Sequence, residues 1–179
     1  MLSRENTGLI LVDVQGKLAR LVHESERVIA QCETLVQGAK ALALPILWLE
    51  QNREKLGATV ESLSLLLTGH KPIVKFTFDA CEEVSFMRAV RDTGRTSWLI
   101  CGIEAHICVY QTALHLRLLN YQVQLVGDCI SSRYPANIQL AKEKLLHSGV
   151  GLTGVEMCLY ELVKDCRAPE FREILALIK

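Results

Sequence analysis

Short apolar runs alternate along this chain with longer segments in which apolar residues recur every three or four positions. Runs such as residues 9–12 and 46–49 contain no polar side chain, so as strands they would be buried on both faces. Residues 24–43 place Val28, Cys32 and Leu35 on one helical stripe. Strands that alternate with helices imply right-handed crossovers, and therefore a parallel sheet covered on both sides.

The full pattern predicts an α/β fold, a Rossmann-like three-layer αβα sandwich with a central parallel sheet of about six strands. The expected strands span residues 9–12, 46–49, 73–78, 97–101, 122–126 and 150–153. The expected helices span residues 24–43, 82–93, 106–119, 136–148, 155–164 and 169–177. No linker, repeat or low-complexity segment interrupts this pattern, so we expect a single domain over residues 1–179.

Composition excludes several classes of function. The 20 basic side chains balance 20 acidic ones, so the basic footprint of a nucleic-acid-binding protein is missing. No apolar run approaches the ~18 residues of a membrane span, and the first residues do not have the pattern of a signal peptide. The seven cysteines include no CxxC pair, as is typical of free thiols in a reducing compartment. We therefore expect a cytoplasmic protein that acts on a small molecule, with no nucleic-acid or membrane partner.

Two charged residues stand at or near the carboxyl ends of predicted strands, where open parallel sheets bind their ligands. Asp13 ends the first strand, and Lys75 interrupts the third. A buried lone charge costs several kcal/mol unless it is paired, so a carboxylate and an ammonium in one crevice would stabilise each other. The alternatives are a helix-capping Asp13 and an edge-strand Lys75 that reaches solvent.

Cys108 falls in the first turn of the helix that follows the fourth strand, where free N–H groups and the helix dipole favour anions. With Lys75 nearby, we expect a lowered thiol pKa and hence an activated nucleophile. The alternative is a buried structural thiol. His106 lies only two residues away, so its side chain would point elsewhere and make a poor base. The other histidines lack metal-ligand spacing, and we expect neither a metal site nor a cofactor.

A magnesium-dependent phosphatase is a second possibility, since residues 13–18 are similar to the DxDGT start of aspartyl-phosphate enzymes. That chemistry needs a second carboxylate two residues beyond the nucleophile, where this chain has Gln15. Asp128 follows the fifth strand without another acid within reach. The pattern therefore disfavours this class.

Asp13, Lys75 and Cys108, in this order and setting, resemble the catalytic set of the isochorismatase-like cysteine hydrolases, which include nicotinamidases and carbamoylsarcosine amidohydrolases. The similarity is strongest in residues 102–113, GIEAHICVYQTA. It extends over nearly the whole chain, with further matches at residues 11–15, 49–59, 75–78 and 128–141. The chain most resembles the small isochorismatase domain-containing proteins, whose physiological substrates are generally unassigned.

The resemblance implies a mechanism. Cys108 would attack an amide carbonyl and form a thioester, with Asp13 as the proton carrier and Lys75 holding Asp13. It also implies a cis peptide bond between Ile103 and Glu104, which would let the backbone N–H groups of Glu104 and Cys108 form an oxyanion hole.

Two departures refine this expectation. The segment after the second strand has no DxH, so the metal site of nicotinamidases is not implied. Isochorismatase itself cleaves an enol ether without a cysteine thioester, so Cys108 favours the amidase side of the family. We expect the substrate pocket to be lined by residues close to the triad, namely Gln15, Gln51, Phe76, Phe78, Glu104 and Tyr110. Glu104 at the mouth would favour a substrate with a donor or a positive group.

The sequence therefore predicts a cysteine-dependent hydrolase of a small amide or related C–N bond. The alternative is a catalytically quiet binding or assembly protein on the same scaffold. By resemblance we also expect a homo-oligomer, and an apolar stripe near the end of the chain is the expected interface, namely Phe171, Ile174, Leu175 and Ile178.

Overall fold

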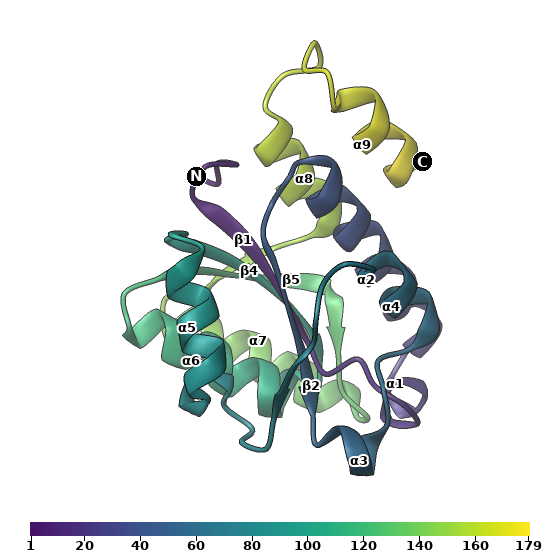
Figure 1. Ribbon diagram of the computed structural model, residues 1–179, viewed down its shortest axis with the longest axis vertical. Coiled ribbons are helices and arrows are strands. Elements are labelled where there is room, and N and C mark those ends of the chain that lie inside the picture. Colours follow the sequence, from purple (N-terminus) through teal and green to yellow (C-terminus); the bar gives the residue numbers. More distant parts are fainter.

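The computed structural model describes residues 1–179 and has one parallel sheet between two layers of helices (Figure 1). The six strands lie in the order β3-β2-β1-β4-β5-β6, and every neighbouring pair is parallel. The strands are β1 (Thr7–Val12), β2 (Ile46–Gln51), β3 (Ile73–Lys75), β4 (Ser97–Ile103), β5 (Gln122–Ser131) and β6 (Gly151–Thr153). The predicted fold class is confirmed.

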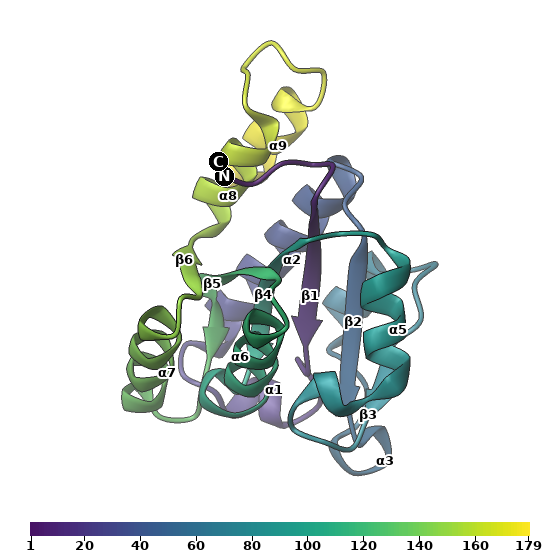
Figure 2. The same cartoon turned by 90° about the vertical axis from the view of Figure 1, so that its left-hand side faces the viewer.

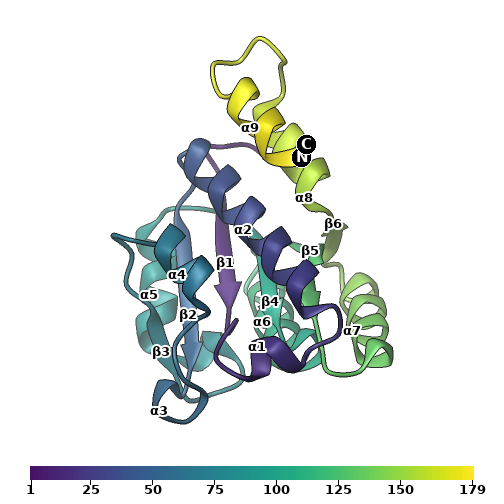
Figure 3. The same ribbon diagram turned by 90° about the vertical axis from the view of Figure 1, so that its right-hand side faces the viewer.

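The helices divide between the two faces of the sheet. The α-helices are α1 (Leu18–Leu21), α2 (Ser25–Ala41), α3 (Arg53–Leu56), α4 (Glu61–Leu66), α5 (Val84–Asp92), α6 (Tyr110–Leu118), α7 (Pro135–His147), α8 (Val155–Val163) and α9 (Phe171–Ile178). Helices α5, α6 and α7 cover one face (Figure 2), and α2, α4, α8 and α9 lie on the other side (Figure 3). A 3-10 turn, η1 (Ala80–Glu82), precedes α5, and a π-helical turn, η2 (Ala105–Val109), precedes α6.

The continuous apolar runs are explained by burial on both faces. In β1, Leu9 and Leu11 belong to the core under α2, while Ile10 and Val12 belong to the core under α6. Successive side chains of a strand point to opposite faces, so a strand between two helical layers needs an apolar residue at every position.

The ends of two strands differ most from the prediction, and three short helices are additional. Strand β3 ends at Lys75 and does not continue to residue 78, because the chain turns away and the Phe76 N–H donates to the Glu83 carboxylate (3.1 Å). Strand β5 continues to Ser131, five residues beyond the predicted end at residue 126. The short helices α1, α3 and α4 were not predicted, since four to six residues are too few to show a helical period.

The carboxyl ends of β1 and β4 approach closely at Gly102, which has a φ of 120°. A Cβ atom built on Gly102 would lie 2.0 Å from the Val12 carbonyl oxygen, so only glycine fits there. This contact holds Asp13, which follows β1, beside the loop that leads from β4 to Cys108.

The apolar stripe of α9 packs within its own chain. Ile174 is fully buried in the core with α2 and α8, and Phe171 meets the Tyr160 ring edge-on at 6.1 Å between centroids. Phe171, Leu175 and Ile178 are only half-buried within the chain, and the interface between copies through this stripe stays a prediction. No helix combines the length and apolar character that a membrane crossing requires.

Candidate active site

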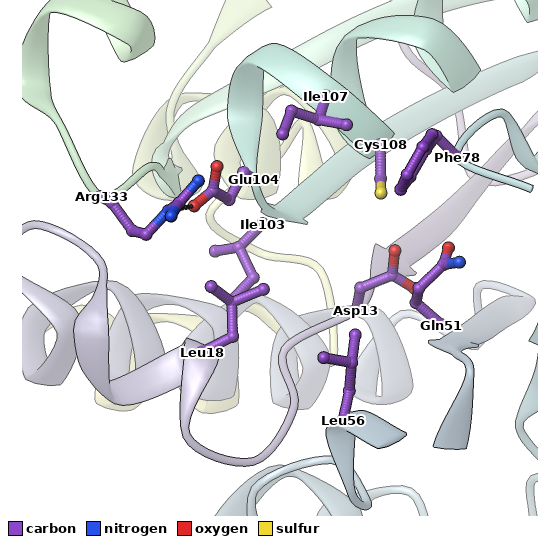
Figure 4. Close-up of a pocket in the computed structure, with 10 residues that line it drawn as sticks. All are labelled: Asp13, Leu18, Gln51, Leu56, Phe78, Ile103, Glu104, Ile107, Cys108 and Arg133. Atoms are coloured by element: carbon purple, nitrogen blue, oxygen red, sulfur yellow. Dashed lines mark hydrogen bonds and ion pairs between the residues drawn. The ribbon is translucent and has the colours of Figure 1, made fainter. Parts of the chain in front are cut away.

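Asp13, Lys75 and Cys108 converge at the carboxyl edge of the sheet. Asp13 directly follows β1 with a φ of 51°, Lys75 is the last residue of β3, and Cys108 lies in η2 after β4. The Cys108 sulfur points toward the Asp13 carboxyl group (Figure 4). The three residues come from separate βα connections, which parallel topology brings to one edge.

A fully buried ion pair forms the floor of this site. The Lys75 ammonium donates to Asp13 Oδ2 at 2.7 Å, to Gln51 Oε1 at 2.6 Å and to the Thr77 carbonyl at 3.2 Å. All three ammonium donors therefore have acceptors, as a buried charge requires. Asp13 is thus not a helix cap, and Lys75 does not reach solvent.

The Cys108 thiol is held in its protonated form at rest. Burial, followed by the negative charge of Asp13, raises the pKa of Cys108 to about 12, while Lys75 acts in the opposite direction. The prediction of a lowered thiol pKa is therefore wrong. The helical turn and the lysine favour the thiolate, but desolvation and the adjacent carboxylate outweigh them.

Asp13 is a stronger base than an exposed aspartate. Burial raises the pKa of its carboxyl group, and this effect exceeds the lowering by Lys75. One carboxylate oxygen, Oδ1, is buried without a hydrogen-bond partner and is free to accept a proton. A raised carboxylate pKa next to a protonated thiol suits proton transfer during attack rather than a standing thiolate.

Asp13 and Cys108 face a small, largely apolar cavity of about 140 Å³, whereas Lys75 contacts Asp13 without lining it. Its walls come from both halves of the sheet edge and combine apolar side chains with a few polar ones (Figure 4). The lining residues are Asp13, Leu18, Gln51, Leu56, Phe78, Ile103, Glu104, Ile107, Cys108 and Arg133. This size suits a small molecule.

Of the predicted wall residues, Gln51, Phe78 and Glu104 line the cavity, and Gln15, Phe76 and Tyr110 do not. The buried Gln15 amide accepts from the Gln51 N–H at 2.6 Å and donates to the Gly57 carbonyl at 2.7 Å, so it fastens the loop after β2. Phe76 is 69% exposed, because the chain turns after β3. Tyr110 instead stacks against the Lys144 ammonium, 5.0 Å from its ring centre.

The cavity also has residues that the sequence did not indicate. Leu18 and Leu56 lie on the short helices α1 and α3, while Arg133 follows β5. Arg133 follows the carboxyl end of a parallel strand, where ligand sites form in open α/β sheets. This position in the sequence could have indicated that Arg133 lines the site.

Glu104 is buried, and its charge is already balanced. Arg133 Nε donates to Glu104 Oε1 at 2.5 Å, while Oε2 has no hydrogen-bond partner. The hypothesis that Glu104 selects a positive substrate is therefore not favoured.

His106 contacts Ser132 Oγ at 2.9 Å and Asn137 Nδ2 at 3.2 Å through its two ring nitrogens, away from Cys108. The peptide bond between Ile103 and Glu104 is cis.

Comparison with known proteins identifies the family of this chain. The model of the isochorismatase domain family matches residues 7–157. The chain belongs to the isochorismatase domain family. A relative from Phytophthora sojae, named secreted isochorismatase effector Isc1, is 36% identical over 96% of this chain and 83% of its own length.

Solved structures of this family share the fold. The MAR1 ribonuclease of Caenorhabditis elegans superposes with a TM-score of 0.93 at 29% identity, covering 99% of this chain and 91% of that one. The YcaC gene product of Escherichia coli is described as an octameric hydrolase of unknown specificity. It superposes with a TM-score of 0.93 at 22% identity, covering 98% of this chain and 89% of that one. The Phytophthora relative is named a secreted protein, so the cytoplasmic location of this isochorismatase-domain chain stays a prediction.

Proposed function

We propose that this isochorismatase-domain chain is a cysteine-dependent hydrolase of a small amide or a related C–N bond. The observation that carries this proposal is the Cys108 thiol directed at Asp13 in one small cavity, with Lys75 holding Asp13 at 2.7 Å. A thiol, a base and a fixed cation in contact are the groups that acyl transfer requires.

In the first half-reaction, Asp13 takes the thiol proton as the sulfur attacks the carbonyl carbon. The C–N bond then breaks, the leaving amine takes the proton from Asp13, and a thioester remains on Cys108. In the second half-reaction, Asp13 takes a proton from water as the water oxygen attacks the thioester carbon. The C–S bond then breaks, the acid is released, and Asp13 returns the proton to the Cys108 sulfur. The backbone N–H groups of Glu104 and Cys108 are proposed to bind the oxyanion.

The charge balance of the cavity favours a neutral substrate. Arg133, the cationic residue of its lining, pairs with Glu104, and the adjacent Lys75 pairs with Asp13. No cation there is left to bind a dicarboxylate such as isochorismate or the phosphates of an RNA strand. A small neutral amide satisfies the walls without leaving a charge unpaired.

The proposal is tested by incubating the protein with a panel of small aliphatic and aromatic primary amides. Ammonia release is measured, and intact-protein mass spectrometry of quenched samples detects the acyl adduct. We expect both signals in the wild type and in Cys166→Ser, a matched loss of an exposed cysteine, and neither in Cys108→Ala.

Ammonia release that persists in Cys108→Ala would exclude the thioester route. Calorimetric binding of an amide without adduct or turnover would instead favour the catalytically quiet binding protein.

A further inference from the structure

A second cluster of chemically reactive side chains lies outside the triad. The ligand atoms of Asp79, Cys81 and His115 all lie within 4.8 Å of one another. Asp79 and Cys81 belong to the segment between β3 and α5, and His115 lies on α6. The three residues form neither the triad nor the lining of the cavity.

The cluster is already partly organised. Asp79 Oδ2 lies 2.7 Å from His115 Nδ1, while Asp79 Oδ1 accepts from the Cys81 N–H at 2.9 Å and so fixes the carboxylate plane. The buried Cys81 sulfur has only a long contact of 3.8 Å to the Thr112 carbonyl. Glu82 Oε1, 3.8 Å from His115 Nδ1, adds a further oxygen at the solvent side.

Thiolate, imidazole and carboxylate together are the ligand set that Zn²⁺ prefers, at ~2.0–2.3 Å in tetrahedral geometry. Ligand atoms in such a tetrahedron are separated by roughly 3.3–3.8 Å. The Asp79–His115 contact would therefore open slightly and Cys81 would move closer. We propose that Asp79, Cys81 and His115 bind Zn²⁺, with Glu82 or water as the fourth ligand.

The other cysteines do not offer such a site. Lys75 stands beside Cys108 and repels a cation. Four further cysteines, Cys32, Cys101, Cys129 and Cys158, are fully buried in the core, and exposed Cys166 belongs to no group of ligand-type side chains. Cys81 alone combines a thiol with a histidine and a carboxylate.

The location suggests what bound zinc would do. The same segment carries Phe78, a wall of the cavity, and the Thr77 carbonyl that accepts from Lys75. At present the Ala80 N–H donates to Thr112 Oγ at 3.0 Å and ties this segment to α6. Zinc would add a stronger link, and would fix the Phe78 wall against the helix that follows Cys108.

The test uses the metal-free full-length protein titrated with Co²⁺, a spectroscopic substitute for Zn²⁺. We expect one equivalent to bind with a thiolate-to-cobalt charge-transfer band, which Zn²⁺ then abolishes. Asp79→Asn, Cys81→Ser and His115→Gln should each weaken binding about tenfold or more. Asp79→Asn removes the carboxylate charge but retains the Oδ1 acceptor for the Cys81 N–H. Weaker binding in this variant would therefore result from the lost carboxylate ligand and not from unfolding of η1.

The controls are Cys108→Ser and Cys166→Ser, which should retain the band and the affinity. Zn²⁺ should also raise the melting temperature of the wild type and both controls, but not that of the three ligand variants. A cobalt spectrum without a thiolate band, a band that survives in Cys81→Ser, or a band lost in Cys108→Ser would each overturn the proposal. None of these readouts depends on amide hydrolysis.

Discussion

In the proposed mechanism, one proton moves between Cys108 and Asp13. The group that holds this proton before substrate binds determines when the thiol can attack. With the thiol pKa raised to about 12 by burial and by Asp13, the proton stays on sulfur until a substrate arrives. In the proposed mechanism, Cys108 therefore depends on Asp13 to remove this proton at the moment of attack.

This dependence gives a prediction about non-additivity. Cys108→Ala and Asp13→Asn should each lower kcat/KM by roughly a thousandfold or more, and the double variant should be no worse than either single one, because groups that act as a unit fail together. The measurement is steady-state turnover of the best amide, with Cys166→Ser as the control. Additive losses would show that the two residues act independently.

The pH dependence of kcat/KM should follow the titration of the Asp13 carboxyl group. Its pKa is raised by burial, so kcat/KM should increase with pH through a midpoint above the ~3.9 of an exposed aspartate. Lys75→Met removes the cation that lowers this pKa, and should move the midpoint to higher pH. A midpoint at or below ~3.9, or one unmoved in Lys75→Met, would contradict the assignment of Asp13 as the base.

The same substitution has a consequence for stability. Lys75→Met leaves the Asp13 carboxylate buried without its partner, which costs ~3–5 kcal/mol at neutral pH. A carboxyl whose pKa is raised in the folded state stabilises the fold fully below its unfolded pKa, and this stabilisation is lost as pH rises through the folded pKa. Urea unfolding should therefore find Lys75→Met closest to the wild type in mild acid. A deficit independent of pH would point to packing instead.

At the scale of elements, the contact between β1 and β4 determines where Asp13 lies. Gly102→Ala would place a Cβ 2.0 Å from the Val12 carbonyl oxygen and should destabilise the fold by more than ~2 kcal/mol. Gly94→Ala is the control, because Gly94 also has a positive φ but nothing within 4 Å of its Cβ position. Equal losses of unfolding free energy in the two variants would mean that backbone strain alone matters.

Sequence patterns predicted the elements that are long or continuously apolar, and predicted that Asp13, Lys75 and Cys108 would lie together at the carboxyl ends of the strands. The pattern failed where an element is only about one helical turn long, as in α1 and α3, so Leu18 and Leu56 were missed as cavity walls. The thiol pKa was also missed. Spacing places Cys108 near a helix start, but only coordinates reveal how deeply it is buried beside Asp13.

The cluster of Asp79, Cys81 and His115 illustrates the same limit. Asp79 and Cys81 are close in sequence, but His115 follows on a helix after a further strand, so no local spacing joins the three. Tertiary packing of α6 against η1 brings them together.

At the scale of the whole molecule, exposed apolar side chains gather at the β3 edge of the sheet. This edge patch consists of Val74, Phe76, Phe78 and Val84, with Phe76 69% and Val84 71% exposed. The hydrogen bond from the Phe76 N–H to Glu83 brings its two ends together. Apolar patches on an edge strand commonly mark contacts between chains.

We therefore expect the homo-oligomer to form through the edge patch. Light scattering should give a multiple of 20.0 kDa for the wild type. The double variant Phe76→Ser, Val84→Ser should shift toward the monomer. Leu118→Ser, which removes an equally exposed apolar side chain on α6, should not. A monomeric wild type at micromolar concentration would exclude the patch as an interface.

The protonated state of Cys108 also has a consequence for the lifetime of the protein. Peroxide attacks thiolates, and a thiol that is 7% exposed with a pKa of about 12 offers almost none. Oxidative damage should begin at Cys166, the one exposed cysteine, which lies in the connection between α8 and α9. Cys108, the proposed nucleophile, should therefore be oxidised more slowly than Cys166.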